Sequence, residues 1–226
     1  MIVLGIDTAT PATAVALLDS GAPGGAGVRR HDPAPGERPG HTAQLLALAH
    51  EQLAGAGMTF ADVDRIAVGL GPGGFTGLRI GVATARALAW ASSAQIVGLS
   101  SLRALAAGAT APPGRGVLAV IDARRGEVFA AGFRGAEQVL APRALAPAQI
   151  RAVAGGRWLA VGDGAVRFRA ELEGAGCHVP ADRSPQHRIG AGALCRLALE
   201  ARHGMALELI VPHYLRPPDA TRTHPR

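Results

Sequence analysis

Two strand–aspartate–strand units constrain the fold of this chain more than any other feature. In the first unit, an apolar run ends at Asp7 and a second apolar run follows it. The same pattern recurs 115 residues later at Asp122, with apolar segments at 116–121 and 128–133. Each unit is typical of a β-hairpin with an aspartate at its tip. The recurrence predicts two similar halves of an α/β protein, each a sheet with packed helices.

A Pro-Pro-Gly segment at 112–114 is typical of a linker between such halves. We therefore expect residues 1–108 to form the N-terminal half and residues 109–226 the C-terminal half. The C-terminal half would hold the last helix and an Arg- and Pro-rich tail after Tyr214 that is poorly ordered. If the halves are duplicates, Asp7 and Asp122 should lie at equivalent hairpin tips that face the cleft between them.

Periodicity and capping residues predict the remaining elements. Helices are expected at 41–55, 76–93, from Ser100 to Gly108, near 147–154 and at 189–203, and strands at 65–70, near 158–161 and, weakly, near Val28.

The composition excludes several kinds of enzyme. All 23 basic residues are arginine, so a P-loop lysine, a kinase lysine and a Schiff-base lysine are absent. The eight histidines form no H-E-x-x-H or His-x-x-x-His pair, and no G-x-S-x-G elbow occurs. The net charge of +6 is compatible with nucleic-acid contact but does not show it. No apolar run reaches 18 residues and the N-terminus is not a signal peptide, so we expect a cytoplasmic protein without a membrane span.

The segment GLGPGG at 69–74 matches the dinucleotide pattern G-x-G-x-x-G between a strand and a helix. That fingerprint also requires an acid about twenty residues further on, and none occurs between Asp64 and Asp122. The helix that follows could hold an anion at its N-terminus, but spacing alone favours a simple tight turn.

The two long helices carry more apolar surface than one buried face requires. A stripe of small residues at Gly77, Gly81, Ala85 and Ala89 suits close packing within the domain. Other faces of both helices are also apolar, which indicates either deep burial or a helical partner. On the residues alone, burial is favoured.

The aspartate-tipped hairpins occupy the place of the phosphate loops in actin-like phosphotransferases. Those loops need glycine for close approach to phosphate, whereas Thr8 follows Asp7 and Ala123 follows Asp122. Neither loop suits tight nucleotide binding, and the exposed pair Arg124 and Arg125 is typical of a solvated surface.

Several segments, in order along nearly the whole chain, resemble one family. They are LGIDTAT, HTAQLLALAHEQL, GPGGFTGLRIGVATARALAWA, VGLSSLRALA, VIDARRGEVFAAGF, AVGDGA and PHYLR. This pattern resembles the TsaB (YeaZ) family of bacterial tRNA threonylcarbamoyladenosine biosynthesis proteins. The motif residues that carry it are Gly71, Pro72, Gly73, Phe75, Thr76, Gly77, Arg79 and Gly81.

The resemblance implies an actin/Hsp70-like (ASKHA) fold of two ribonuclease-H-like halves and a non-catalytic role. Such a subunit supports a paralogous, metal-dependent transferase that threonylcarbamoylates adenosine 37 of tRNA, together with a small ATPase. Contact with tRNA would come through the complex, and the chain alone would form a homodimer. The resemblance implies no cofactor or metal of its own and leaves room for a nucleotide at a subunit interface.

The resemblance also reverses the preference for burial of both helices, because family members pair through them. The candidate interface residues are Leu45, Leu48, Gln52, Ile80, Thr84 and Leu88. The competing interpretations are a stand-alone actin-fold phosphotransferase or ATPase and a metallopeptidase, for which the sequence lacks phosphate-loop glycines and metal ligands respectively.

Overall fold

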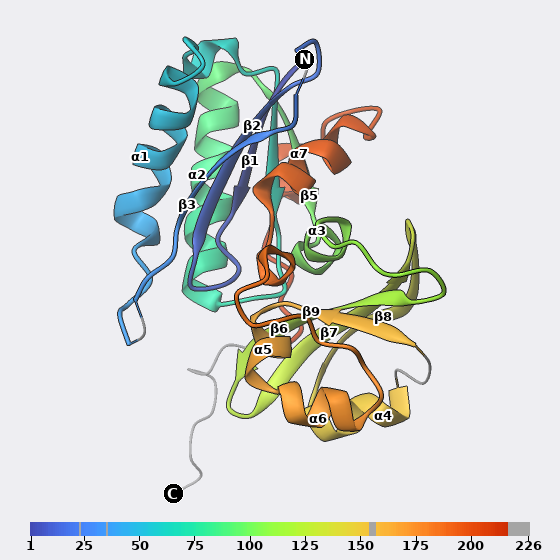
Figure 1. Ribbon diagram of the computed structural model, residues 1–226. Helices are drawn as coiled ribbons and strands as arrows, with labels where there is room; N and C mark the ends of the chain where they lie inside the picture. Colours follow the sequence, from blue (N-terminus) through green and yellow to red (C-terminus); the bar gives the residue numbers. More distant parts are fainter. Residues whose placement is uncertain (23, 35, 154–156, 217–226) are drawn as a thin grey trace, which may run out of the picture.

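The computed structural model describes residues 1–22, 24–34, 36–153 and 157–216. Two β-sheets, each with its own helices, form an upper and a lower half in Figure 1. The part of the predicted C-terminal tail beyond residue 216 lies outside the described residues. So does residue 154, the predicted end of the helix near 147–154. Within the described part of the chain, no helix has the length and hydropathy to span a membrane.

The sheet of the first half has the strand order β3-β2-β1-β4-β5. Strands β1, β2 and β3 form an antiparallel meander, and β4 and β5 continue the sheet in parallel with β1. The strands are β1 (Ile2–Asp7), β2 (Thr13–Asp19), β3 (Gly27–His31), β4 (Arg65–Gly69) and β5 (Gln95–Leu99).

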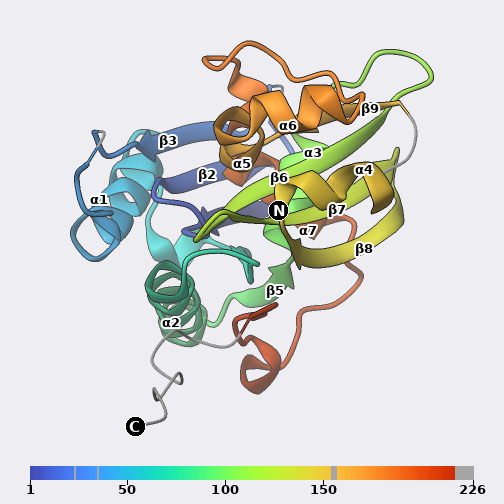
Figure 2. The ribbon, with the colours of Figure 1, turned by 90° about the horizontal axis from the view of Figure 1, so that it is seen from below.

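Helices cover both faces of this sheet. On one face, α1 (His41–Ala54) and α2 (Phe75–Ser92) pack against alternate strand residues such as Leu4, Ile6 and Ile66. On the other face, α7 (Ala191–Leu199) packs against the intervening residues, such as Val3 and Ala67. Figure 2 shows α1 and α2 on one side of the sheet and α7 on the other. The period of two along each strand thus gives this half two separate cores.

The second half repeats this plan with one strand fewer. Its order is β8-β7-β6-β9, in which β6, β7 and β8 form an antiparallel meander and β9 runs parallel to β6. One face packs against three short helices, and α3 covers the other. The elements are β6 (Gly116–Arg124), β7 (Glu127–Arg134), β8 (Glu137–Leu145), α4 (Ile150–Val153), β9 (Trp158–Val161), α5 (Asp163–Arg167), α6 (Arg169–Gly174) and α3 (Ser101–Ala107).

The strand orders therefore confirm the duplication predicted from the two hairpins. Meander β1-β2-β3 with parallel β4 corresponds to meander β6-β7-β8 with parallel β9. Asp7 pairs with Ala14 next to the turn of the first hairpin, and Asp122 pairs with Val128 near the turn of the second. This is the actin/Hsp70-like fold of two ribonuclease-H-like halves that the sequence predicts.

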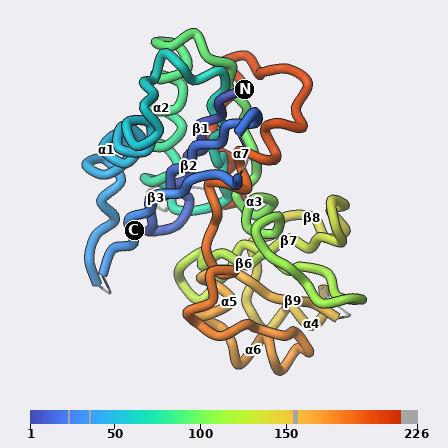
Figure 3. The backbone as a smooth tube through the Cα atoms, turned by 45° about the horizontal axis from the view of Figure 1, so that its top comes forward, coloured from blue at the N-terminus to red at the C-terminus, as the bar shows by residue number. Residues whose placement is uncertain are grey.

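The last helix differs from its expected place. The sequence assigns residues 109–226 to the second half, yet α7 packs against β1, β2 and β4 of the first sheet. Arg65 on β4 fixes it there, since its Nη1 donates to the carbonyl oxygens of Ala198 (2.5 Å) and Ala201 (2.8 Å). The chain thus passes between the halves twice, through α3 into β6 and back again before α7 (Figure 3).

Candidate functional site

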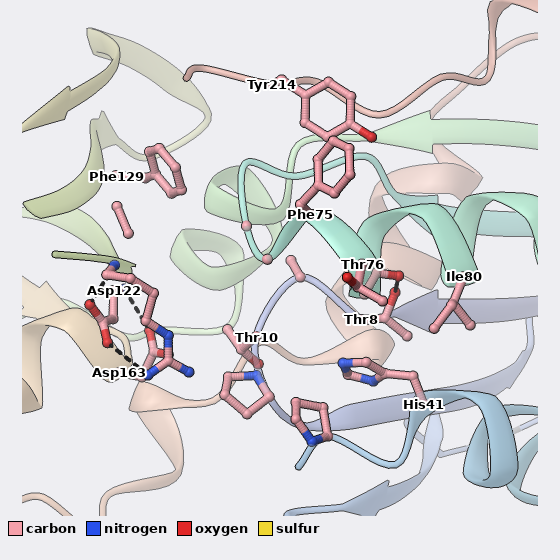
Figure 4. A pocket seen from close by; sticks show the side chains of 18 of the residues that line it. Thr8, Thr10, His41, Phe75, Thr76, Ile80, Asp122, Phe129, Asp163 and Tyr214 are labelled. Atoms are coloured by element: carbon pink, nitrogen blue, oxygen red, sulfur yellow. Dashed lines mark hydrogen bonds and ion pairs between the residues drawn. The ribbon is translucent and has the colours of Figure 1, made fainter. Parts of the chain in front are cut away.

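A cavity of about 620 Å³ opens between the two halves, at the ends of both hairpins (Figure 4). The first half contributes the β1–β2 turn, the start of α1 and the start of α2. The second half contributes the β6–β7 hairpin and the start of α5, and the chain after α7 closes one side. The polar and aromatic lining residues include Thr8, Thr10, Arg38, His41, Phe75, Thr76, Asp122, Arg124, Phe129, Asp163, His213, Tyr214 and Arg216.

Asp7 does not face this cavity, contrary to the prediction. It is 2% exposed, and its carboxylate accepts hydrogen bonds from Ser101 Oγ (2.7 Å) and the Ala9 amide (2.9 Å). Burial raises the pKa of this carboxyl, and the hydrogen bonds from Ala9 and Ser101 oppose that shift in part. Asp7 therefore fixes the turn and the start of α3, and its carboxylate is not available to a ligand in the cavity.

Asp122 lines the cavity as predicted, but its charge is already compensated. Its Oδ1 accepts from the Arg124 amide at 2.9 Å, the same two-residue turn that Asp7 makes with Ala9. Its Oδ2 lies 2.7 Å from Arg167 Nη1 and 3.5 Å from Arg124 Nη1. The equivalent aspartates of the two halves thus share a turn geometry but have different partners.

Asp163 stands beside Asp122 at the start of α5. Its Oδ1 accepts from the amides of Asp122 (3.1 Å) and Gly164 (2.9 Å). Burial raises the pKa of Asp163 to about 6, against the effect of these amides, and the neighbouring charge of Asp122 adds to the rise. Sequence reasoning did not single out this residue, because one acid in AVGDGA carries no pattern.

The glycine-rich motif forms the wall of the cavity nearest the first hairpin. The Gly74 amide donates to the Ala9 carbonyl at 2.7 Å, and Thr8 Oγ1 donates to the Gly77 carbonyl at 2.7 Å. A Cβ at Gly77 or Gly81 would collide with Thr8. The small-residue stripe of α2 is therefore buried against the β1–β2 turn, the place within the domain that the sequence predicts for it.

Phe75 and Arg79 join the motif to the C-terminal segment. The Arg79 guanidinium lies 3.8 Å from the centre of the Phe75 ring, and its Nε donates to Tyr214 Oη at 3.1 Å. The Phe75 and Tyr214 rings are 5.0 Å apart between centroids. Gly71 and Pro72 turn the chain between β4 and α2, with Gly71 at φ +100. The motif thus positions the chain that closes one side of the cavity.

The candidate interface residues do not form one surface. Leu45, predicted to lie at a partner surface, is 1% exposed and packs into the core beneath α1, so it has almost no surface to offer a partner in this structure. Leu48, Gln52, Ile80, Thr84 and Leu88 are half-buried. Gln52 lies against Gly27 of β3, and Ile80 lines the cavity. Sequence reasoning missed the most exposed large apolar side chains of the two helices, Trp90 (78%) and Leu46 (50%).

The outer positions of α1 and α2 are nearly free of charge. On α2 beyond Arg79 they are Ala83, Ala87, Trp90 and Ala91, and on α1 they are Thr42, Ala43, Leu46, Ala47, His50, Ala54 and the single acid Glu51, which pairs with Arg29. We call the exposed residues Ala43, Leu46, Ala47, Ala83, Ala87 and Trp90 the outer face. A solvated helix face is normally rich in charged residues, so this one is unusual.

Among the residues that the structure describes, no group of three or more His, Cys, Asp or Glu is placed to hold a metal ion.

The fold and the inter-half cavity define the chain as an actin-like protein. A family model described as "TsaD: tRNA N6-adenosine threonylcarbamoyltransferase" matches residues 37–155, more than half of the chain. The crystal structure of YeaZ from Pseudomonas aeruginosa matches 94% of this chain and 100% of its own, at 30% identity and a TM-score of 0.75. The chain belongs to the TsaB (YeaZ) family.

Two relatives by sequence carry the name tRNA threonylcarbamoyladenosine biosynthesis protein TsaB. The protein from Escherichia coli is 40% identical over 59% of this chain and 55% of its own length. The protein from Bacillus subtilis is 34% identical over 57% of this chain and 53% of its own. In these matches the chain spans about half the length of the relatives.

Proposed function

We propose that this protein is the non-catalytic partner subunit of the complex that makes threonylcarbamoyladenosine at position 37 of tRNA. In this role it binds and supports the paralogous metal-dependent threonylcarbamoyl transferase. A small ATPase is the third component, and tRNA is contacted through the complex in the cytoplasm. The family of the chain supports this role, since its relatives are named for the biosynthesis of that nucleoside.

The outer face of α1 and α2 is the observation that carries the proposal. Its alanines allow another helix to approach closely, and Trp90 offers a large apolar side chain that is 78% exposed. Tryptophan is enriched among the residues that dominate binding energy at protein interfaces. The surface fits the transferase in the complex and a second copy of this chain when the protein is alone.

Independent phosphotransfer is not supported by the cavity. A phosphotransferase of this fold would need carboxylates available for a metal–nucleotide complex. Asp7 is turned away from the cavity toward Ser101, and Asp122 is paired with Arg167 and Arg124. Asp163, the remaining acid of the lining, accepts two backbone amides, and burial raises its pKa to about 6. No cofactor of the chain itself is part of the proposal, which leaves a nucleotide at the subunit interface as a property of the complex.

The test compares two substitutions of exposed apolar residues. Trp90→Arg introduces a cation near the C-terminus of α2, where it suits the helix dipole, and should weaken binding to the transferase about 30-fold or more. Val139→Arg, at a 44% exposed position on β8, is the matched control and should bind like wild type. Titration calorimetry with the transferase gives both affinities, and circular dichroism verifies the fold of each variant.

Two results would contradict the proposal. Wild-type affinity of Trp90→Arg would place the partner elsewhere on the molecule. Threonylcarbamoylation of tRNA by the purified chain alone, with the transferase excluded by mass spectrometry, would show that the subunit is itself catalytic.

A further inference from the structure

The first turn of α2 presents unpaired backbone amides to the cavity. The N-cap residue Gly74 has no side chain that could accept hydrogen bonds from these amides, and the first turn contains no acidic residue. The amide of Gly74 is bonded to Ala9 and that of Leu78 to Gly74, whereas those of residues 75–77 have no acceptor among the described residues. An 18-residue helix adds the positive end of its dipole at this point.

His41 is a second, independent donor at the same place. It is 4% exposed, and Figure 4 shows its ring pointing toward the cavity beside Thr8. Its Nε2 has no hydrogen-bond partner among the described residues, and a Cβ on Gly77 would lie 3.0 Å from this atom. The buried imidazole therefore ends at the first turn of α2 with one polar atom unused.

The hydrogen bond to Thr13 is the basis for assigning the proton of the His41 ring. Thr13 is fully buried, and its hydroxyl lies 2.9 Å from His41 Nδ1. No other acceptor for that hydroxyl hydrogen lies among the described residues, so we assign Thr13 as the donor to Nδ1 and place the ring hydrogen on Nε2. Burial, and then the charge of nearby His31, lower the pKa of His41, so at neutral pH the ring is an uncharged donor toward the cavity.

The charges around the cavity favour an anion. Arg38, Arg124 and Arg216 line it, whereas the two acids, Asp122 and Asp163, lie in the second half, across the cavity from α2. Asp122 is neutralised by its arginine partners, and Arg216 pairs with Glu127 outside the lining. The chain as a whole carries a net charge of +6. The end of the cavity at α2 thus has no acidic residue in the first turn of the helix and receives the positive end of its dipole and its backbone donors.

We propose that this chain binds a phosphate group inside its own cleft, held by the backbone amides of residues 75–77 and by His41 Nε2. The volume of about 620 Å³ accommodates either free phosphate or a mononucleotide whose phosphate sits at α2. The site lies within one chain, so it is distinct from a nucleotide bound at a subunit interface. It also differs from a phosphate-loop site, because neither hairpin aspartate takes part.

The probes are inorganic phosphate, AMP and adenosine, titrated into the full chain in a phosphate-free buffer and followed by two-dimensional NMR. We expect phosphate and AMP to bind and to shift the amide signals of residues 75–77, and adenosine not to. Tighter binding of AMP than of phosphate identifies a nucleotide as the ligand, and equal affinities identify free phosphate. Equal binding of adenosine and AMP would overturn the inference, because the site would then recognise the nucleoside.

Thr76→Asp is the decisive variant. Thr76 is exposed, and a carboxylate in the first turn of a helix favours folding, so the variant should be at least as stable as wild type. The same carboxylate competes for the amides and should lower the affinity for phosphate and AMP about tenfold or more, as expected for loss of charge-assisted hydrogen bonds. Gln138→Glu adds the same charge on β8 and should leave the affinity unchanged.

A pair of variants tests His41. His41→Gln keeps an amide near the position of Nε2 and should retain binding, whereas His41→Asn keeps a partner for Thr13 but loses the cavity donor and should weaken it. Absence of phosphate and AMP binding at millimolar concentration would refute the site. So would unchanged affinity in both Thr76→Asp and His41→Asn.

Discussion

Leu45 and Leu46 are consecutive residues of α1 that should respond oppositely to the same substitution. Leu45 is 1% exposed and packs in the core between α1 and the first sheet, whereas Leu46 is 50% exposed. Truncation of a fully buried leucine removes its transfer free energy and leaves a cavity, so Leu45→Ala should cost about 3 kcal/mol. Leu46→Ala leaves no cavity and should cost about 0.5 kcal/mol or less.

Urea unfolding followed by circular dichroism measures both changes. With an m-value of about 3 kcal/mol/M for a chain of this size, Leu45→Ala should lower the midpoint by about 1 M and Leu46→Ala by less than about 0.2 M. The m-value should not change in either variant, since the surface exposed on unfolding is nearly the same. Equal midpoint shifts, or the larger shift in Leu46→Ala, would refute the assignment of the buried face of α1.

Two further predictions concern buried charged groups. Arg65→Met should lower the free energy of unfolding by about 3 kcal/mol or more, because it leaves the carbonyls of Ala198 and Ala201 without their donor. Urea unfolding measures this loss. An equal loss for Arg143→Met, at an exposed position of β8, would contradict the prediction. Burial raises the pKa of Asp163 from 3.8 in the unfolded chain to about 6, so its contribution to stability is complete below pH 3.8 and is lost as the pH rises through 6. The melting temperature of wild type, compared with that of Asp163→Asn, should therefore fall between pH 4 and pH 7. If the difference in melting temperature between the two proteins does not change with pH, the pKa of Asp163 is not raised.

The hairpins, the duplication and the long helices could be predicted because their signals are local. Alternating apolar residues around Asp7 and Asp122 determine the strands, and short turns determine which strands pair. The sequence predicts that α3 begins at Ser100, and the Ser100 hydroxyl does accept the amide of Arg103 as its N-cap. Each of these features lies within a stretch of about 20 residues, where periodicity and capping are informative.

The place of α7 and the buried face of α1 could not be predicted, for two different reasons. An amphipathic helix needs an apolar partner but does not specify which sheet supplies it, so α7 could be assigned to either half. On α1 the buried stripe is His41, Leu45, Ala49 and Leu53. A histidine and an alanine give this stripe a weak apolar signal. The sequence therefore predicts one surface from Leu45, Leu48 and Gln52, whereas in the structure Leu45 is buried and the other two are half-buried.

The cavity was beyond sequence reasoning because its walls come from segments far apart in the chain. Its strongest donor, His41, is a lone histidine at a helix start, and its amides belong to a turn that spacing alone assigns to tight packing. The glycines of that turn do allow close packing against Thr8. The same packing brings the first turn of α2 to the edge of the cavity, so one motif serves both structure and a binding surface.

The two equivalent hairpins use their aspartates differently. In the first half the carboxylate of Asp7 is buried against Ser101, and the turn after it fills the groove made by the small residues of α2. In the second half Asp122 is held by Arg167, and its turn stays at the cavity. Neither of these two aspartates therefore offers a free carboxylate to a metal–nucleotide complex in the cleft. The anion site that we propose at the α2 end of the cleft consists of helix amides and a neutral histidine. Because α2 lines this cleft with its first turn and carries Trp90 in its last, an anion at one end and a protein partner at the other would contact the same rigid helix.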